Sequence, residues 1–390
     1  SKYSANRSSG MSLFTPVQGI IGGSLIGGSA GVLLIMNGEI MGASGILSNT
    51  LINPFKALQN PKNHWRYVYL ASFALTVNLF INYLASPEFL SDERSQANDV
   101  PIPSTAAYLL GGLLVGFGTK LGNGCTTGHG ICGIARFSKR SLVATCMFTG
   151  CSMLATFATS PLRSYAAATN FLHATGMPNI SNIGSGLFMA ASVFAALISP
   201  ALSAKNRFCN NNTGDQDQQN AAVNEDKKVL GASISGAMFA AGLCISGMVK
   251  TSKVHDFLCL SGFSRGSYDP TLMTVMGSAI LASWLAYQFV DGSWSSVLPK
   301  ERTLSCPAGL SDGACFSVPT NTVIDGQLLT GAATFGIGWG LTGVCPGPAL
   351  FAAASGNMNA IVLWMPAFVV GSMAGSKIKE LWKNTKKKSA

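Results

Sequence analysis

Nine stretches of about twenty mostly apolar residues recur along this chain, and they constrain its fold more than any other feature. An α-helix needs about 20 such residues to cross the roughly 30 Å hydrocarbon core of a bilayer. Only 11% of the 390 residues are charged, which is too few to solvate a water-soluble enzyme, because soluble domains carry about 25%. We therefore predict an all-α integral membrane protein with about nine transmembrane helices. These cover residues 17–36, 67–86, 104–122, 141–160, 184–202, 229–249, 272–290, 327–344 and 360–378.

Four shorter apolar segments, broken by Gly or Pro, each follow the end of one of these spans. They comprise residues 39–51, 125–137, 252–260 and 346–355. Irregular backbone at membrane depth is tolerated only where it is buried in protein or lines a cavity. We therefore expect four short re-entrant half-helices. Small residues spaced four apart, such as Gly23, Gly27 and Gly31, predict close packing between helices.

Two motifs occur twice, in the same order. Gly116, Gly118, Leu121 and Cys125 match the residues that stand 220 positions later, and Ser44–Gly45 matches Ser246–Gly247. Five spans precede a polar linker and four follow it, so the second half must start from the opposite side of the membrane. Related halves then form an inverted pseudo-twofold repeat, which is typical of transporters. The expected units are an N-terminal tail (1–16), a first repeat (17–204), the linker (205–228), a second repeat (229–380) and a basic tail (381–390).

The distribution of Lys and Arg predicts the orientation. With nine spans the termini lie on opposite faces, and the face of the C-terminus holds most of the 26 Lys and Arg residues, among them Arg66, Lys120, Arg136, Arg140 and Lys379. The positive-inside rule places this face in the cytoplasm or the mitochondrial matrix. The net charge of +10 then reflects topology, and we expect no nucleic-acid partner. Residues 1–10 suit the remainder of a targeting segment, so a bacterial-type plasma membrane and a mitochondrial inner membrane both stay open.

Two cysteines occupy positions that favour anion binding. Cys125 follows Gly122-Asn123-Gly124 at the break between a span and a short segment, and Cys345 precedes Pro346, a residue suited to the first position of a helix. Both thiols would then stand at helix N-termini, where open amide groups and the positive end of the dipole attract anions. The alternative is that Gly and Pro permit tight packing and that the cysteines only fill space.

The other polar candidates have competing interpretations. His129 can donate a hydrogen bond in a pocket or serve packing; no second pair of ligands accompanies it, so we expect no metal. Glu39 can bind a proton or cap the helix that follows it. No nucleotide-binding motif is present, so no cofactor is expected. Cys146 and Cys151, inside a span, are predicted to be small core residues. A disulfide between Cys306 and Cys315 is disfavoured, because the expected side of that loop is reducing.

The cysteine motifs resemble the signatures of a known family. The run Cys125-Thr126-Thr127-Gly128-His129-Gly130-Ile131-Cys132-Gly133 is similar to the first signature of the YeeE/YedE sulfur-transport family, and Cys345-Pro346-Gly347-Pro348-Ala349-Leu350 is similar to the second. Residues 242–248, with Cys244, resemble the partner half, which many bacteria make as a separate polypeptide. The chain thus looks like a fusion of both halves.

This resemblance implies transport of thiosulfate or a related small sulfur anion and no enzymatic activity. In such proteins cysteine thiols line a narrow central constriction and pass the anion along by weak S–H hydrogen bonds. Carried over to this chain, the relay thiols are Cys125, Cys244 and Cys345. The other residues expected around the anion are Thr126, Gly128, His129, Gly130, Pro346, Gly347 and Pro348.

Two departures from the family pattern keep an alternative open. Some branches have a cysteine where this chain has Gly42, and bacterial members often have an arginine at the position of Glu39. The chain could therefore be a transport-inactive structural subunit of a larger membrane complex, such as a respiratory one, with protein partners as well as lipid. A thiol-redox enzyme using Cys125 and Cys132 ranks last, because their spacing is not that of a Cys-x-x-Cys motif.

Overall fold

The computed structural model describes residues 14–60, 63–84, 105–169, 193, 215–265, 267–290, 304, 306–307 and 316–388. These residues are helical, apart from loops and two isolated β-bridges. Five helical stretches are long and apolar enough to cross a membrane, and a sixth arises if a pair bent by 43° counts as one span. The predicted all-α architecture is confirmed. The number nine stays a prediction, and its fifth span (184–202) lies outside the described residues except for one position.

Eight long helices correspond to the other eight expected spans. They are α1 (Pro16–Asn37), α4 (His64–Leu79), α6 (Thr105–Gly122), α7 (Lys139–Thr169), α9 (Asp215–Ser246), α12 (Thr271–Gln288), α13 (Gly326–Thr342) and α15 (Met365–Lys388). Two π-helical segments extend them, η2 (Phe80–Leu84) after α4 and η6 (Asn359–Trp364) before α15. Helix α9 begins well before residue 229, so the second half of the polar linker is helical. Residues 215–228 contain neither Gly nor Pro, and nothing in them breaks a helix.

Short helices occupy the four broken segments: α2 (Ala43–Leu51), η3 (Thr126–Gly133), α10 (Thr251–Leu258) and α14 (Pro346–Ala354). Two further short helices, α3 (Pro54–Gln59) and α11 (Gly262–Arg265), lie in connections. Helices α1 and α13 end at Gly38 and Gly343, whose φ angles are +72° and +67°. Glycine adopts this left-handed conformation without strain, and the chain can turn sharply there into the next segment.

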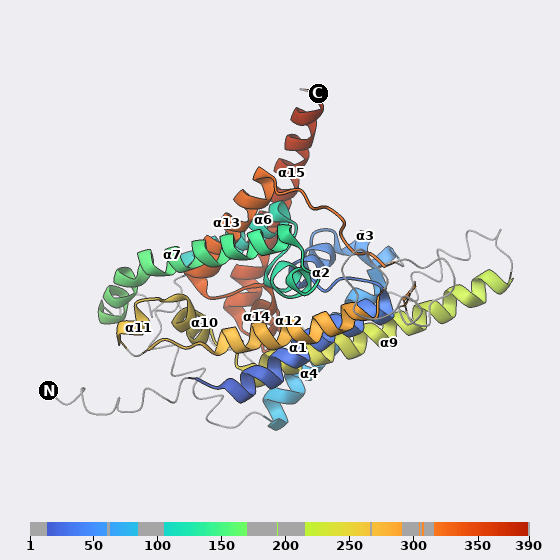
Figure 1. Cartoon of the computed structure of the whole chain (residues 1–390), viewed down its shortest axis with the longest axis horizontal. Coiled ribbons are helices and arrows are strands. Elements are labelled where there is room, and N and C mark those ends of the chain that lie inside the picture. Colours follow the sequence, from blue (N-terminus) through green and yellow to red (C-terminus); the bar gives the residue numbers. More distant parts are fainter. Residues whose placement is uncertain are drawn as a thin grey trace.

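The long helices pack in two rows. In the first row the order is α12, α1, α9 and α4, and in the second it is α7, α13, α6 and α15, each helix contacting its neighbours in the row. Figure 1 shows α1, α9 and α12 running alongside one another, with α15 at a steep angle to them. The four short helices lie between the rows, because α2, η3 and α10 each contact members of both and α14 contacts the first row and η6, the segment that leads into α15. In the first row η3 touches α1 and α12, and α14 touches α4 and α9.

Glycines bring the helices of each row close together. A Cβ atom at Gly27 would lie 2.1 Å from the carbonyl oxygen of Ala279 on α12, and one at Gly116 would lie 2.1 Å from that of Phe368 on α15. At Gly23 the nearest atom would be the Ser278 hydroxyl oxygen, also at 2.1 Å. No side chain fits at these distances, so the predicted small-residue packing is confirmed.

The prediction for Cys146 is wrong, because this side chain is exposed on the outer face of α7. Cys151 is half-buried and lies against Gly336 of α13. A bilayer makes the outside of a membrane helix as apolar as its inside, so hydrophobicity alone does not indicate which face is buried. Cys306 is a free thiol, whereas Cys315 and the N-terminal tail to residue 13 lie outside the described residues.

Candidate functional site

Both signature cysteines stand at the start of a short helix, as predicted. Cys125 is the N-cap of η3 and Cys345 is the N-cap of α14, with Pro346 in the first turn. Neither helix has a side-chain cap at this position, so amide groups of the first turn remain open to other acceptors. In α14 this applies to Gly347 alone, because Pro346 and Pro348 have no amide hydrogen. Cys125 is 0% exposed, and Cys345 is half-buried. These are positions where an anion would be stabilised by backbone donors.

Hydroxyl groups connect the two helix starts. The Thr126 hydroxyl donates to Cys345 Sγ at 3.7 Å, so the two signatures meet directly. Cys125 Sγ lies 3.1 Å from the Thr127 hydroxyl oxygen, which also accepts a hydrogen bond from the Ala43 amide at 3.3 Å. The start of α2 thus joins the same cluster. Thr127 and Ala43 were not among the expected site residues.

Two cavities approach this cluster. The first, of about 380 Å³, is mostly apolar and includes Thr126, Thr127, Ile131, Phe148, Trp339, Cys345, Gly347 and Pro348 in its lining. The second, of about 1000 Å³, has a mixed lining with many charged side chains and includes Gly42, Ser44, Lys120, Gly124, Gly128 and His129. We call them the apolar cavity and the basic chamber.

The chain between residues 124 and 128 separates these two spaces, and we call it the septum. Gly124 and Gly128 line the basic chamber, whereas Thr126 and Thr127 line the apolar cavity. Cys125, which is fully buried, lines neither. A buried thiol thus belongs to a short segment whose other residues line one cavity or the other.

His129 holds the septum in place. Its Nε2 lies 3.1 Å from the carbonyl oxygen of Gly122, and its Nδ1 lies 3.1 Å from the Ser141 hydroxyl. A carbonyl only accepts, so Nε2 carries the proton and Nδ1 accepts from the serine. Both ring nitrogens are therefore used within the protein. Of the two interpretations of His129, the structure favours a positioning role, although one side of the ring still borders the basic chamber.

The remaining expected residues are distributed around the apolar cavity. Gly347 and Pro348 line it, and Pro346 is buried beside them. Gly130 packs closely, since a Cβ there would lie 2.9 Å from the terminal methyl of Met276. Cys244 is 2% exposed and lines neither cavity, although its neighbour Leu243 lines the apolar one. The contacts above bring Cys125 and Cys345 together but do not include Cys244.

The two family departures both lie at the basic chamber. Gly42 is the N-cap of α2, and a Cβ there would meet no atom within 4 Å. Glu39 does not cap α2, which has no side-chain cap, so that interpretation is wrong. The cap is missing because Glu39 stands three residues before Gly42 and joins an isolated bridge with Ser317. Burial raises the pKa of Glu39, while Arg66 and Lys228 act in the opposite direction.

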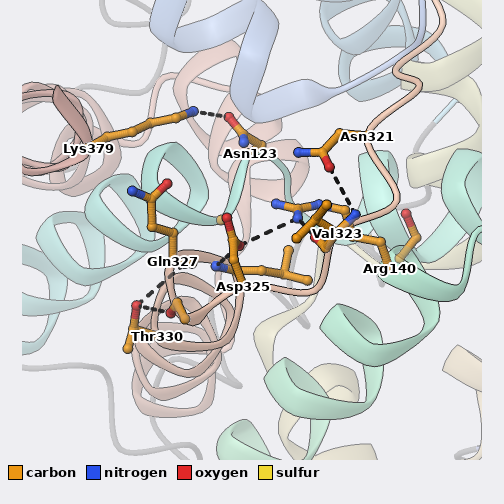
Figure 2. Close-up of polar contacts among 12 residues, drawn as sticks. Asn123, Arg140, Asn321, Val323, Asp325, Gln327, Thr330 and Lys379 are labelled. Atoms are coloured by element: carbon orange, nitrogen blue, oxygen red, sulfur yellow. Dashed lines mark hydrogen bonds and ion pairs between the residues drawn. The ribbon is translucent and has the colours of Figure 1, made fainter. Parts of the chain in front are cut away.

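A loop over residues 316–325 borders the chamber. The backbone amide of Ser317 donates to the carbonyl of Gly38 at 2.7 Å, and Arg136 donates to that of Pro319 at 2.5 Å. Figure 2 shows Arg140 directed at the Val323 carbonyl and at Asp325, while Lys379 reaches Asn123. Basic side chains from α7, from α15 and from the turn that precedes α7 therefore converge at this end of the protein. Within the described part of the chain, no three His, Cys, Asp or Glu side chains gather to hold a metal ion.

Two segments of the chain match known families. Residues 12–154 match a family described as sulphur transport, and residues 227–388 match one described as a family of unknown function. The first segment contains α1 to most of α7, and the second contains nearly all of the described helices that follow. No solved structure shows a significant match.

Curated bacterial proteins resemble parts of the chain. A protein named "Probable transporter" from Xylella fastidiosa (strain Temecula1 / ATCC 700964) is 33% identical over 144 residues, which cover 37% of this chain and 85% of the relative. A second protein of the same name and strain is 37% identical over 130 residues, covering 33% of this chain and 84% of the relative. Each relative is thus covered nearly end to end by a part of this longer chain.

Proposed function

This chain belongs to the YeeE/YedE sulfur-transport family, with two halves joined in one polypeptide, and we propose that it carries thiosulfate or a related small sulfur anion across a membrane. The path runs between the apolar cavity and the basic chamber and crosses the septum. The observation that supports this most is that residues 124–128 separate the two cavities while Thr126 bonds to Cys345.

In the proposed mechanism the protein replaces the hydration shell of the anion at the septum. The thiol of Cys345, with the amide group of Gly347, receives the anion from the apolar cavity. Cys125 and the hydroxyl of Thr127 then hold it on its way to the basic chamber. Thiols are weak donors, so the anion is bound loosely enough to leave, and no covalent bond forms. Cys244 is the third thiol of the proposal, beside Leu243 at the wall of the apolar cavity.

We also infer that the two halves form an inverted repeat, each half with four long and two short helices. The two short helices of each half are then the four re-entrant half-helices. We pair α1 with α9, α4 with α12, α6 with α13 and α7 with α15. Reversing the order of either row then exchanges each helix with its counterpart, as a twofold repeat requires. The short helices obey the same pairing. Helix α2 contacts α4, α6 and α15, while its counterpart α10 contacts α12, α13 and α7. Such repeats bind substrate where their broken helices meet.

Uptake of radiolabelled thiosulfate into liposomes that carry the purified chain tests this function. The variants are Cys125→Ser and Cys345→Ser, with Cys146→Ser as the matched control, because Cys146 is exposed and lines neither cavity. We expect uptake by the wild type and by Cys146→Ser, and none by the two septum variants.

Other outcomes discriminate between the alternatives. Uptake that survives both substitutions keeps transport but removes the thiols from the path. A folded wild type that takes up neither thiosulfate nor sulfite nor sulfide indicates the structural subunit of a larger complex, the alternative that Gly42 and Glu39 leave open. The thermal unfolding of each variant in detergent establishes that a loss of uptake is not a loss of fold.

A further inference from the structure

The basic chamber carries more positive charge than its surroundings neutralise. Two acidic side chains, Glu39 and Glu380, line it together with six basic ones. The six are Arg66, Lys120, Arg136, Arg140, Lys379 and Lys383. The positive-inside rule accounts for basic residues on one face of a membrane protein, but it does not require them to surround one cavity. Five of them converge from α4, α6, α7 and α15, and Arg136 comes from the turn before α7, so the arrangement is a property of the fold.

Neutral oxygen atoms satisfy most of these cations. The Lys120 ammonium donates to Ser48 Oγ at 3.1 Å and to Asn49 Oδ1 at 3.4 Å. The Arg66 guanidinium bonds to Asn63 and stacks at 4.7 Å on the ring of Trp65.

At the other side of the chamber the pattern is the same for Arg136, which bonds to the carbonyl of Pro319, and for Lys379, which bonds to Asn123. Arg140 differs, since it also has a carboxylate partner, Asp325, at 3.5 Å, as Figure 2 shows. Among the described residues, no carboxylate lies within ion-pair distance of Arg66, Lys120, Arg136 or Lys379, and Glu39 attracts Arg66 only from further away.

The first turn of α2 adds backbone donors to the same space. Gly42, Ser44 and Gly45 line the chamber, and Gly42 and Gly45 have no atom within 4 Å of the place where a Cβ would stand. A ligand can thus approach the main chain closely. The helix presents its positive end there, and Lys120 contacts Ser48 one turn further along.

We propose that the basic chamber is a second anion site, which binds a small divalent oxyanion such as sulfate or thiosulfate between Lys120, Arg66 and the first turn of α2. This inference rests on the proposed function, since it gives the transported anion a binding site on one side of the septum. Charge and hydrogen bonds to oxygen recognise the ligand in the chamber, where no cysteine is among the lining residues. The chamber therefore accepts sulfate, whereas the thiols of the septum select anions that contain a reduced sulfur.

Equilibrium binding of radiolabelled sulfate to the purified full chain in detergent tests the chamber without requiring transport. The variants are Lys120→Gln and, separately, Arg66→Gln, with Lys377→Gln as the matched control, because Lys377 is exposed on α15 and does not line the chamber. A hydrogen bond to a charged partner contributes enough to change affinity by about tenfold or more. We expect each chamber variant to bind sulfate at least roughly tenfold more weakly, and we expect Lys377→Gln to bind it as the wild type does.

The results separate this inference from the proposed function. Sulfate binding that depends on Lys120 and Arg66, in a protein that fails to take up thiosulfate, supports the chamber and removes only the transport step. No saturable sulfate binding by the wild type, or equal binding by wild type and both chamber variants, overturns the inference even where uptake succeeds. Binding that is lost in Lys377→Gln as well points to diffuse surface charge and overturns it too.

Discussion

The hydrogen bonds of His129 allow a quantitative test of how the septum is held. Replacing His129 by Leu introduces an apolar side chain of similar size and removes both ring nitrogens, which bond to the Gly122 carbonyl and the Ser141 hydroxyl at 3.1 Å each. Each bond contributes about 0.5–1.5 kcal/mol in soluble proteins, and about 0.6 kcal/mol on average in a membrane protein. We expect His129→Leu to lower the free energy of unfolding by about 1–3 kcal/mol.

Ser141→Ala removes one of the two bonds, so it should cost roughly half as much. The double variant should cost less than the sum of the single ones, because the bond between the two side chains is lost only once. Unfolding by SDS titration in mixed micelles measures all four proteins, and thiosulfate uptake should fall with His129→Leu because the septum loses its support. Strict additivity, or a His129→Leu variant as stable as the wild type, would refute the role assigned to His129.

Three further predictions concern other residues. Gly124→Ala should impair stability and uptake, because its Cβ would lie 2.6 Å from the adjacent imidazole ring, whereas Gly128→Ala, with no atom within 4 Å, should fold as the wild type does in thermal unfolding. Gly27→Ala should destabilise the protein by about 1–3 kcal/mol through overpacking, and Gly150→Ala, in open space, should not. Burial raises the pKa of Glu39, so sulfate binding should strengthen as the pH falls through this pKa and the carboxylate loses its charge. Glu39→Gln should bind sulfate tightly throughout and lose that pH dependence, a difference on the order of 1–2 kcal/mol above the pKa; the same pH dependence in both proteins would contradict this.

The sequence predicted the helices well because each leaves a local signal. Apolar length marked the long helices, and the short apolar segments broken by Gly or Pro marked the positions of α2 and α14. Pro346 at the start of α14 and Cys125 at the start of η3 could also be inferred from neighbouring residues. Such features depend only on the residues beside them in the chain.

Contacts between distant segments could not be predicted in the same way. Nothing near Thr127 in the sequence indicates that its hydroxyl accepts from Ala43, 84 positions away. The exposure of Cys146 depends on which face of α7 packs on α13, and apolar residues cover both faces. The basic residues were expected on one face, but their enclosure of a single chamber arises from the packing of four helices.

The most direct test of the central claim, that a sulfur anion occupies the septum beside Cys125 and Cys345, is the rate at which each cysteine is alkylated. The protein in liposomes is treated with a membrane-permeant maleimide, with or without thiosulfate, and each cysteine is quantified by mass spectrometry of its peptide. Cys146, exposed and outside both cavities, is the internal reference for the reagent. The account predicts that thiosulfate slows alkylation of Cys125 and Cys345 but not of Cys146, and that sulfate protects none of them. Equal rates at Cys125 and Cys345 with and without thiosulfate would contradict it.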